Sequence, residues 1–424
     1  MSTHSNTRQH DAHYQVALVL QGGGALGAYH IGAYQALHEA GYEPDWVSGI
    51  SIGAVNAALI VGNQPDARLG KLTEFWDEIS RPDGWGAAFG GDLRKWFNWG
   101  SVTEAVLFGQ PQFFSPRFPS PYFAPPGTPG ATSFYDTSPL RSTLERLADF
   151  DLINSGHVRL SLGATRVRTG ELVFFDSHRQ VIAPEHVMAS GSLPPGFPAT
   201  QVEGEMYWDG GCVSNTPLGA INEDPPSVPT LVFMIDLFNP EGPEPVTLDE
   251  VLWRQKQIQF ASRTTHAINS VARQHRLRYA LSRVSGQLPA EAPRDATAQG
   301  ALEREYGEMC FCRIVYEPRR DQIPMSDAEF SRPSIADRRA AGYSDMMSCL
   351  REKPWLSPVG EAAESVGRGA AESDGRGAVA PVGSVVYECR RGRISRRDLD
   401  ARPAIQGPRK RSVIGPLLTP GGVH

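Results

Sequence analysis

Residues 16–27 read VALVLQGGGALG and join five apolar residues to a run of glycines. The apolar run is typical of a buried strand, and residues 28–37 have the composition of a helix that begins directly after the loop. Three consecutive glycines at the end of a strand leave backbone N–H groups unobstructed by side chains. We therefore expect this loop to receive an anion, or an oxygen atom that becomes negatively charged during a reaction.

A serine between two glycines follows the next apolar stretch. Gly49-Ile50-Ser51-Ile52-Gly53 lies between Trp46-Val47, which we expect to be a strand, and the apolar, helix-forming residues 54–59. A strand, a tight turn and a helix in this order present the serine hydroxyl at a helix N-terminus, where backbone N–H groups stabilise developing negative charge. Glycines flank such a serine because the strained turn leaves little room for side chains. The pattern predicts that Ser51 is a nucleophile.

A carboxylate lies in a further glycine turn. Trp208-Asp209-Gly210-Gly211 follows the apolar Met206-Tyr207. A serine hydroxyl is a poor nucleophile at neutral pH and needs a base within hydrogen-bond reach. An aspartate with its ordinary pKa of about 3.9 is a weak base, but burial among residues 206–208 would raise that pKa. The alternative is an ordinary Asp-Gly turn in a hairpin. The presence of Ser51 and the triple glycine in the same chain favours the base.

Histidine is the other residue type that could activate the serine. Of the eleven histidines, His178 and His186 are the best candidates, because they lie in the segment that leads to Asp209. Neither belongs to a turn motif that would aim its ring at Ser51. We therefore interpret both as surface or capping residues and keep Asp209 as the predicted base.

The glycine loop has a second interpretation. Gly22-x-Gly24-x-x-Gly27 after a strand also matches the dinucleotide-binding fingerprint, which requires an acidic residue about 20 positions later, at the end of the second strand. Asp45 has this spacing, but it precedes the second strand, and the serine turn follows that strand. The order of the motifs therefore favours serine chemistry over nucleotide binding.

Taken in order, the glycine-rich loop, Gly-x-Ser-x-Gly and Asp-Gly-Gly resemble the patatin-like phospholipase family. The resemblance covers residues 14 to about 240, and residues 245–356 resemble the helical extension of a bacterial branch of that family. It implies an α/β fold of three layers, in which helices flank a central, mostly parallel sheet. Many members carry a basic residue in the glycine loop where this chain has Ala25-Leu26. A direct charge pair with a phosphate head group is therefore not implied here.

The resemblance also implies roles for individual residues. Ser51 would be the nucleophile of a Ser–Asp dyad, and Asp209 its proton acceptor. Residues 192–198, which are rich in proline, would line the pocket. The implied oxyanion-hole residues are Gly22, Gly23 and Gly24, and the further motif glycines are Gly27, Gly49, Gly53, Gly210 and Gly211. The resemblance implies no cofactor and no metal ion.

The activity implied by the resemblance is hydrolysis of fatty acyl esters of phospholipids or related lipids, through an acyl-enzyme intermediate, in lipid catabolism. The partner would be a lipid or another acyl-ester substrate, and peripheral contact with a membrane is compatible with this activity. The alternative is a non-catalytic lipid-binding or scaffold protein that retains the fold. The three motifs in one chain favour the enzyme.

Composition and charge argue against several other classes of protein. The net charge of −6 over 424 residues argues against a nucleic-acid partner. Five cysteines, an odd number at scattered spacings, form no disulfide framework, and we expect reduced, buried thiols. The N-terminus lacks the apolar segment of a secretion signal, and no apolar run is long enough to span a bilayer. We therefore expect a cytoplasmic protein, at most peripheral at a membrane.

The chain divides into four expected regions. We expect residues 1–13 to form a disordered arm and residues 14–244 to form the catalytic domain. Within that domain, residues 81–135 form an insertion rich in aromatic residues and proline, which we interpret either as a cap over the site or as an irregular loop packed on the sheet. Residues 245–356 predict a helical extension whose longest helix, residues 248–284, carries arginines that suit either a solvated face or anionic head groups. Residues 357–424 predict a disordered, low-complexity tail.

Overall fold

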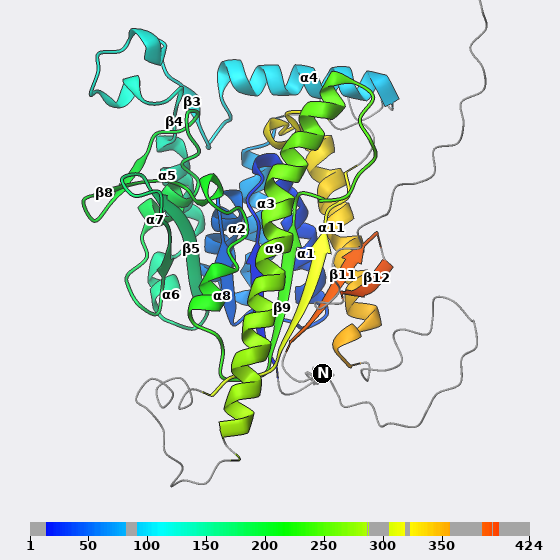
Figure 1. The fold of residues 1–424 in the computed structure, drawn as a ribbon. Helices are drawn as coiled ribbons and strands as arrows, with labels where there is room; N and C mark the ends of the chain where they lie inside the picture. The colour runs from blue at the N-terminus through cyan, green and yellow to red at the C-terminus, as the bar shows by residue number, and fades with distance from the viewer. Residues whose placement is uncertain are drawn as a thin grey trace, which may run out of the picture.

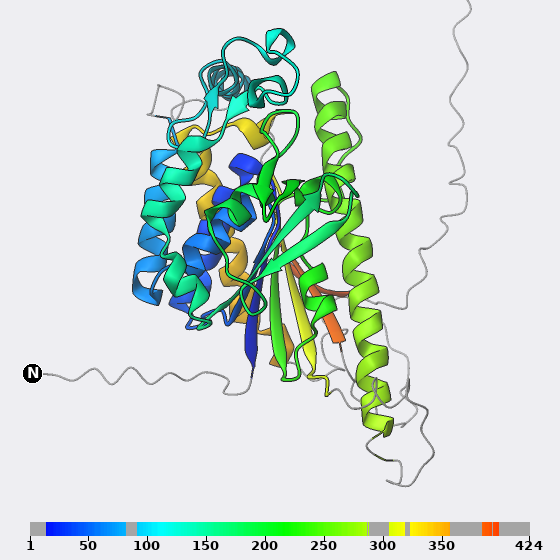
Figure 2. The same cartoon turned by 90° about the vertical axis from the view of Figure 1, so that its left-hand side faces the viewer.

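A central sheet with helices on both faces forms the body of the protein (Figures 1 and 2). The computed structural model describes residues 14–81, 91–285, 287, 305–318, 323–356, 384–391 and 393–397. Across the sheet the strands follow the order β12-β11-β10-β9-β1-β2-β5-β8-β7, and β6 pairs with β5. The predicted α/β fold of three layers is confirmed. The predicted N-terminal arm, residues 1–13, lies outside the described residues.

Neighbouring strands in the middle of the sheet run parallel. The parallel strands are β1 (Gln15–Leu20), β2 (Trp46–Gly49), β5 (Arg159–Arg166), β9 (Thr230–Asp236), β10 (Met309–Val315) and β11 (Ser384–Arg390). The antiparallel strands are β6 (Leu172–Asp176), β7 (Thr200–Val202), β8 (Glu205–Asp209) and β12 (Arg393–Arg397). A separate small ribbon consists of β3 (Ser115–Pro116) and β4 (Tyr135–Asp136).

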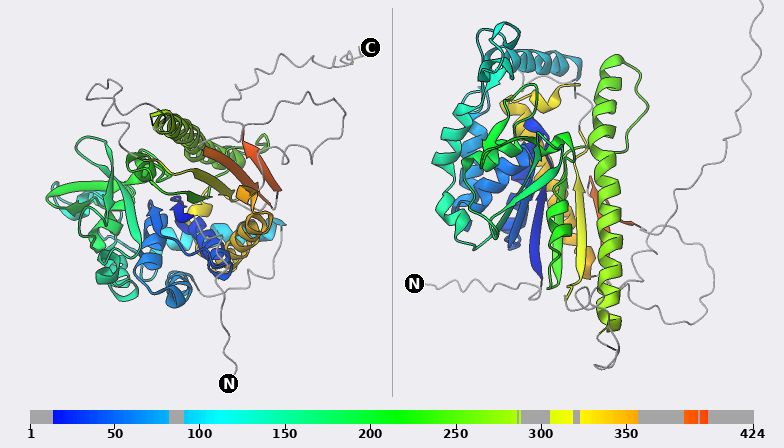
Figure 3. Two further views of the ribbon diagram at one scale, coloured as in Figure 1. Left: turned by 90° about the horizontal axis from the view of Figure 1, so that it is seen from below. Right: turned by 60° about the vertical axis from the view of Figure 1, so that its left-hand side comes forward.

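Helices cover both faces of this sheet, as the views along it show (Figure 3). One face carries α1 (Ala28–Glu39), α2 (Ile52–Val61), α3 (Pro65–Glu78), α5 (Ser138–Leu147), α6 (Phe150–Asn154), α7 (Pro184–Ser190) and α11 (Arg332–Glu352). The other face carries α8 (Gly219–Glu223) and α9 (Leu248–Ser285). Along β1, Leu18 and Leu20 join the first core, whereas Ala17 and Val19 join the second. Burial on both faces explains why this strand reads as a continuous apolar run.

One helix lies inside the insertion that we expected to be irregular. Residues 91–108 form α4 (Gly91–Phe108), because no proline interrupts the chain between Pro82 and Pro111. In Figure 1 this helix lies across the top of the molecule, above α2 and α3. The rest of the insertion divides between the two predicted interpretations. Phe113 and Phe114 are buried as in a packed loop, whereas Phe118 is exposed.

The predicted boundary at residue 244 does not separate a helical extension from the sheet. The strand β10 pairs with β9 on one side and with β11 on the other, so residues from both sides of this boundary form one sheet. On the face of the sheet that carries α1, the helix α11 packs closely against α1. A Cβ atom at Gly32 would lie 1.8 Å from the carbonyl oxygen of Arg339, and one at Gly342 would lie 2.1 Å from that of Tyr29. Glycine at both positions lets the two helix backbones approach.

The predicted disordered tail is wrong for residues 384–390 and 393–397, which form β11 and β12. Val386 and Cys389 of β11 are apolar and buried. They were not recognised as part of a strand because glycine, alanine and arginine dominate the composition of the whole tail. Arg313 of β10, which is 0% exposed, pairs with Asp236 of β9 and with Glu388 of β11 at 2.8 Å. A buried charge network thus joins three neighbouring strands. The remainder of the tail lies outside the described residues.

The long helix α9 confirms the prediction for residues 248–284, and two of its basic residues contact other parts of the protein. Arg263 donates to the carbonyl of Val213 at 2.7 Å, and Lys256 pairs with Asp327 at 2.8 Å. These contacts tie the helix to loops, so neither a freely solvated face nor a head-group surface describes these two residues. No helix among the described residues combines the length and apolarity needed to cross a membrane.

The thiols agree only partly with expectation. All five cysteines are free, and Cys312, Cys349 and Cys389 are buried. Cys310 is half-buried, whereas Cys212 is exposed, which corrects the prediction that the thiols are buried. Within the described residues, no group of histidine, cysteine or acidic side chains could hold a metal ion.

Candidate active site

Ser51 lies in a strained turn between β2 and α2. Its backbone adopts φ 57° and ψ −127°, a left-handed conformation that non-glycine residues rarely adopt. The turn is so tight that a Cβ atom at Gly49 would lie 2.4 Å from the carbonyl oxygen of Gly53. At Gly53, a Cβ atom would lie 2.2 Å from the carbonyl oxygen of Leu20. The two glycines are therefore required by close backbone contacts, as the pattern predicts.

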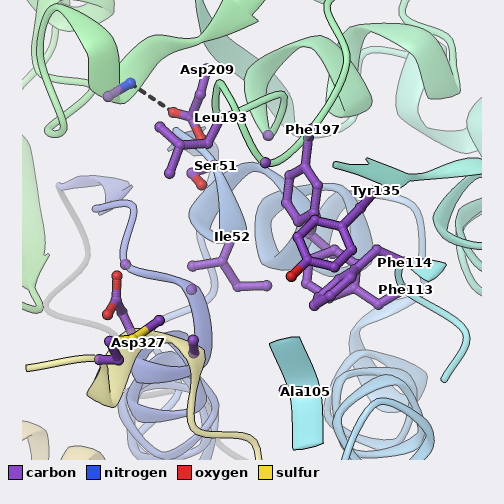
Figure 4. Close-up of a pocket in the computed structure, with 18 of the residues that line it drawn as sticks. Ser51, Ile52, Ala105, Phe113, Phe114, Tyr135, Leu193, Phe197, Asp209 and Asp327 are labelled. Carbon is purple, nitrogen blue, oxygen red and sulfur yellow. Dashed lines mark hydrogen bonds between the residues drawn. The ribbon is translucent and has the colours of Figure 1, made fainter. Parts of the chain in front are cut away.

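Asp209 ends β8 and is 1% exposed. One carboxylate oxygen accepts a hydrogen bond from the N–H of Gly211 at 2.7 Å, and the carboxylate shares a cavity with Ser51. Burial raises the pKa of Asp209 from 3.8 to about 6, and the interactions of the carboxylate with Ser51 and with the N–H of Gly211 oppose this rise only in part. Ser51 and Asp209, far apart in the chain, therefore line the same cavity, and Figure 4 shows their side chains next to one another.

The glycine loop approaches Ser51 from the end of β1. Gly23 and Gly24 line the same pocket as the serine. Gly22 does not share this role, because its N–H donates to the carbonyl of Asn215 at 3.1 Å. A Cβ atom at Gly22 would lie 2.9 Å from the Cβ of Ser51 and 2.4 Å from Oδ1 of Asn215. The prediction that Gly22 is an oxyanion donor is therefore corrected: this glycine is needed for close packing of the loop.

Two side chains that the sequence analysis did not select hold this loop in place. The Nδ2 amide of Asn215 donates to the carbonyl of Gly22 at 2.7 Å and so ties the aspartate turn to the glycine loop. The buried Gln21 donates to the hydroxyls of Thr216 and Thr264, each at 3.0 Å, and accepts from the N–H of Leu237 at 2.6 Å. A buried amide at the end of an apolar strand is the signal that could have identified Gln21. Nothing in the local sequence distinguishes Asn215.

An apolar cavity of about 360 Å³ opens beside Ser51 (Figure 4). Residues 193–197 line it, as predicted for the proline-rich loop. Aromatic and aliphatic side chains form most of the wall, among them Phe113, Phe114, Tyr135, Leu140, Phe197, Phe238, Phe260 and Phe330. Among the described residues, the lining contains no lysine or arginine. The cavity is thus suited to a hydrocarbon group.

The histidines weighed as bases lie elsewhere. The Nδ1 atom of His186 accepts from the N–H of Ala183 at 3.0 Å, and its ring packs against Phe175 with centroids 4.8 Å apart. His178 is exposed. No histidine occurs among the described residues that line the cavity.

Asp45, the residue that a nucleotide site would require, has a structural partner. Its carboxylate accepts a hydrogen bond from the N–H of Val16 at 2.8 Å, near the start of β1. The glycine loop follows the opposite end of this strand. The acidic residue and the loop therefore cannot bind the same nucleotide, which removes this interpretation.

Comparisons with known sequences identify the family. A family model described as "Patatin-like phospholipase" matches residues 18–221, and a second, described as "Patatin phospholipase", matches residues 258–362. Neuropathy target esterase sws of Drosophila sechellia is 57% identical over 63 residues, which are 15% of this chain and 4% of that protein. Human patatin-like phospholipase domain-containing protein 6 is 44% identical over 61 residues, 14% of this chain and 4% of that protein. The chain spans about 4% of the length of these curated relatives.

Solved structures give weaker likenesses. VipD from Legionella pneumophila has a TM-score of 0.29 and 16% identity, over 78% of this chain and 67% of that one. ExoU of Pseudomonas aeruginosa, solved with SpcU, has a TM-score of 0.26 and 14% identity, over 80% of this chain and 78% of that one. These scores add no support to the assignment, which rests on the two family models. Together the models span the strands that carry Ser51 and Asp209 and continue through β10 and α11, and on this ground the chain belongs to the patatin-like phospholipase family.

Proposed function

We propose that this protein hydrolyses fatty acyl esters of lipids, with Ser51 as nucleophile and Asp209 as base. The observation that carries this proposal is the buried Asp209 carboxylate, which lies with a serine in a strained turn at the same apolar cavity. Its raised pKa, about 6, makes it a stronger base than an ordinary aspartate while leaving it ionised at neutral pH. A single buried carboxylate can therefore serve where other hydrolases use histidine.

The reaction proceeds in two stages. Ser51 Oγ attacks the ester carbonyl carbon while its proton passes to Asp209, and the carbonyl oxygen becomes an oxyanion. The bond to the alcohol then breaks, Asp209 returns the proton to the leaving alkoxide, and the acyl group remains on Ser51. Water attacks this acyl-enzyme with Asp209 again as base, which releases the fatty acid and restores the serine. The backbone N–H groups of Gly23 and Gly24, with that of Ile52 at the start of α2, stabilise the oxyanion.

The wall of the cavity supports a lipid acyl chain as the group that is bound. Aromatic and aliphatic side chains offer dispersion contacts along a hydrocarbon, and no described lining residue is cationic. Recognition of the substrate through its acyl chain therefore agrees with the absence of a basic residue at Ala25-Leu26. The second function, a non-catalytic lipid-binding protein with this fold, would use the same cavity without an activated serine.

A labelling experiment separates these two functions. A fluorophosphonate probe reacts only with an activated serine, so we expect the purified protein to be labelled at Ser51. A panel of phospholipids, lysophospholipids and glycerides would then identify the lipid from which fatty acid is released. Lipid binding without labelling and without release of fatty acid would establish the non-catalytic function and overturn the proposal.

The pH dependence of hydrolysis follows from the raised pKa of Asp209. Because the base must be ionised, we expect kcat/KM on an uncharged, water-soluble ester to rise about tenfold per pH unit below pH 6 and to level off above it. The measurement is a pH–rate profile, with circular dichroism over the same range to exclude acid unfolding. A profile that levels off near pH 4, the ordinary range of an aspartate, would argue against Asp209 as a buried base.

The position of Ala105 on α4 gives a test of the acyl site. Ala105 is buried and lines the cavity, so Ala105→Trp would fill space that the acyl chain needs. We expect kcat/KM for long-chain esters to fall about tenfold or more relative to that for acetate esters. Thr103→Trp, on the exposed side of the same helix, is the matched control and should leave this ratio unchanged. Equal losses for short and long chains in Ala105→Trp would place the acyl chain elsewhere.

A further inference from the structure

An exposed aromatic loop projects from the end of the molecule that carries the cavity. Phe118 is 99% exposed, Tyr122 84% and Phe123 82%. Residues 118–135 contain no charged side chain. The loop leaves the body at β3 and returns at β4, and in Figures 1 and 2 it lies at the same end as α4. An uncharged loop with three such exposed rings is unusual for a surface that contacts only water.

The neighbouring helix continues this apolar surface. Trp96, Leu107 and Phe108 of α4 are exposed. The charged residues of this helix balance, with Asp92 and Glu104 against Arg94 and Lys95. We call loop 118–134 together with the exposed apolar side chains of α4 the aromatic surface.

The aromatic surface is continuous with the wall of the cavity. Ala105 and Val106 of α4 line the cavity, and so does Tyr135 at the end of the loop. The Tyr135 hydroxyl donates to the carbonyl of Val106 at 2.8 Å, which fixes the loop to the helix. The N–H of Tyr135 donates to Gly196 in the proline-rich loop at 2.9 Å. A molecule that meets the aromatic surface is therefore beside residues that line the cavity at Ser51.

Charge is confined to the base of the loop. Arg117 and Asp136, which precede and follow the uncharged segment, pair with each other at 3.3 Å. Arg117 also donates to the carbonyl of Tyr135 at 3.1 Å. The loop beyond this pair thus presents rings, prolines and small residues only. This division between a charged base and an uncharged tip matches the change from water to the interfacial region of a bilayer.

The loop has many positions at which no backbone N–H depends on water for a hydrogen bond. Its prolines, at positions 119, 121, 125, 126 and 129, have no N–H to desolvate. Other N–H groups bond within the loop: that of Phe123 donates to Ser120 at 2.8 Å, and that of Ala131 to Thr128 at 3.0 Å. The hydroxyl of Thr128 donates to the carbonyl of Pro125 at 2.8 Å. Hydrogen bonds made within the loop lower the cost of placing an irregular segment among lipid head groups.

We propose that the aromatic surface docks on a lipid bilayer and holds the cavity opening against it. This inference rests on the proposed function, because it identifies the bilayer as the source of the acyl ester that Ser51 would hydrolyse. The lack of charge favours a bilayer over a protein partner, whose interface would add charged pairs at its rim. It also favours docking by insertion of aromatic side chains over attraction to anionic lipids, so that zwitterionic vesicles suffice and salt has little effect.

Vesicle binding tests the proposal without turnover of the lipid. The full chain carrying Ser51→Ala is mixed with large phosphatidylcholine vesicles and floated through a density gradient at low and at high salt. We expect binding at both salt concentrations. The triple variant Phe118→Ser/Tyr122→Ser/Phe123→Ser should bind about 1000-fold more weakly, because each of the three exposed rings contributes about tenfold.

A matched variant controls for the general loss of apolar surface. Val181, Leu277 and Leu281 are also exposed but lie outside the aromatic surface. Their replacement by serine should leave vesicle binding unchanged. On a water-soluble short-chain ester, the triple aromatic variant in the Ser51 background should keep the parental kcat/KM, whereas its hydrolysis of lipid in vesicles should fall. This split distinguishes a docking surface from a damaged active site.

The outcomes separate this inference from the proposed function. If the wild-type protein binds vesicles but has no hydrolase activity, the proposed function is wrong and the docking surface is still supported. Failure of the Ser51→Ala protein to bind neutral vesicles, or equal binding by the triple variant, would overturn the docking surface. A dimer in sedimentation that the triple variant converts to a monomer would assign the surface to a second copy of the chain and likewise overturn it.

Discussion

Ser51→Ala is expected to lower ester hydrolysis by at least about 10³-fold, because the variant has no atom that can form the acyl bond. The fold should persist. Alanine is smaller than serine and carries the same Cβ, so the unusual φ of 57° at this position costs the variant no more than the wild type. Loss of the hydroxyl removes one of the two interactions that oppose the rise of the Asp209 pKa, so this pKa should increase further.

The measurements for this variant are kcat/KM on a soluble ester, fluorophosphonate labelling and thermal unfolding. Ser214→Ala is the matched control, since Ser214 lies near the same turn as Asp209 but does not line the cavity. It should keep both activity and labelling. Retained hydrolysis in Ser51→Ala, with label on another residue, would show that the nucleophile is not Ser51.

Ending the chain after Leu356 is expected to remove most of the stability of the fold. The deletion takes away β11, so β10 becomes an edge strand and its backbone groups lose their partners. Arg313 keeps Asp236 but loses Glu388, and disrupting a buried ion pair costs about 3–5 kcal/mol. Lost burial of Val386 adds about 1.5–3 kcal/mol. These losses approach the whole unfolding free energy of a typical domain, about 5–15 kcal/mol.

Urea unfolding and soluble yield would measure this effect. A chain ending after Arg397 is the control, because it keeps β11 and β12 and should unfold at the same urea concentration as the full chain. Glu388→Gln preserves the shape of the strand and removes its charge, so it should destabilise by less than the deletion. Equal stability of the chains that end at residues 356 and 397 would show that β11 contributes nothing to the folded sheet.

Some elements were predicted from the sequence and others, such as α4 and β11, were not. Comparing β1 with β11 shows why local sequence patterns fail to predict some strands. The pattern of β1 was readable because a strand buried on both faces is continuously apolar. The short apolar run of β11 lies in a segment dominated by glycine, alanine and arginine, so composition alone predicted disorder. It becomes a strand because the edge of β10 and the buried Arg313 are present to receive it.

Local sequence alone identified the turn at Ser51 and the glycine loop, because an apolar strand, glycines at fixed positions and a helix follow one another directly in the chain. Only the tertiary structure decided that Asp209 reaches Ser51, that Asn215 occupies the N–H of Gly22, and that the rings around the cavity meet there. These relations join segments separated by many residues. They exist because β1, β2 and β8 end at neighbouring positions in one sheet, an arrangement that depends on burial of the whole core.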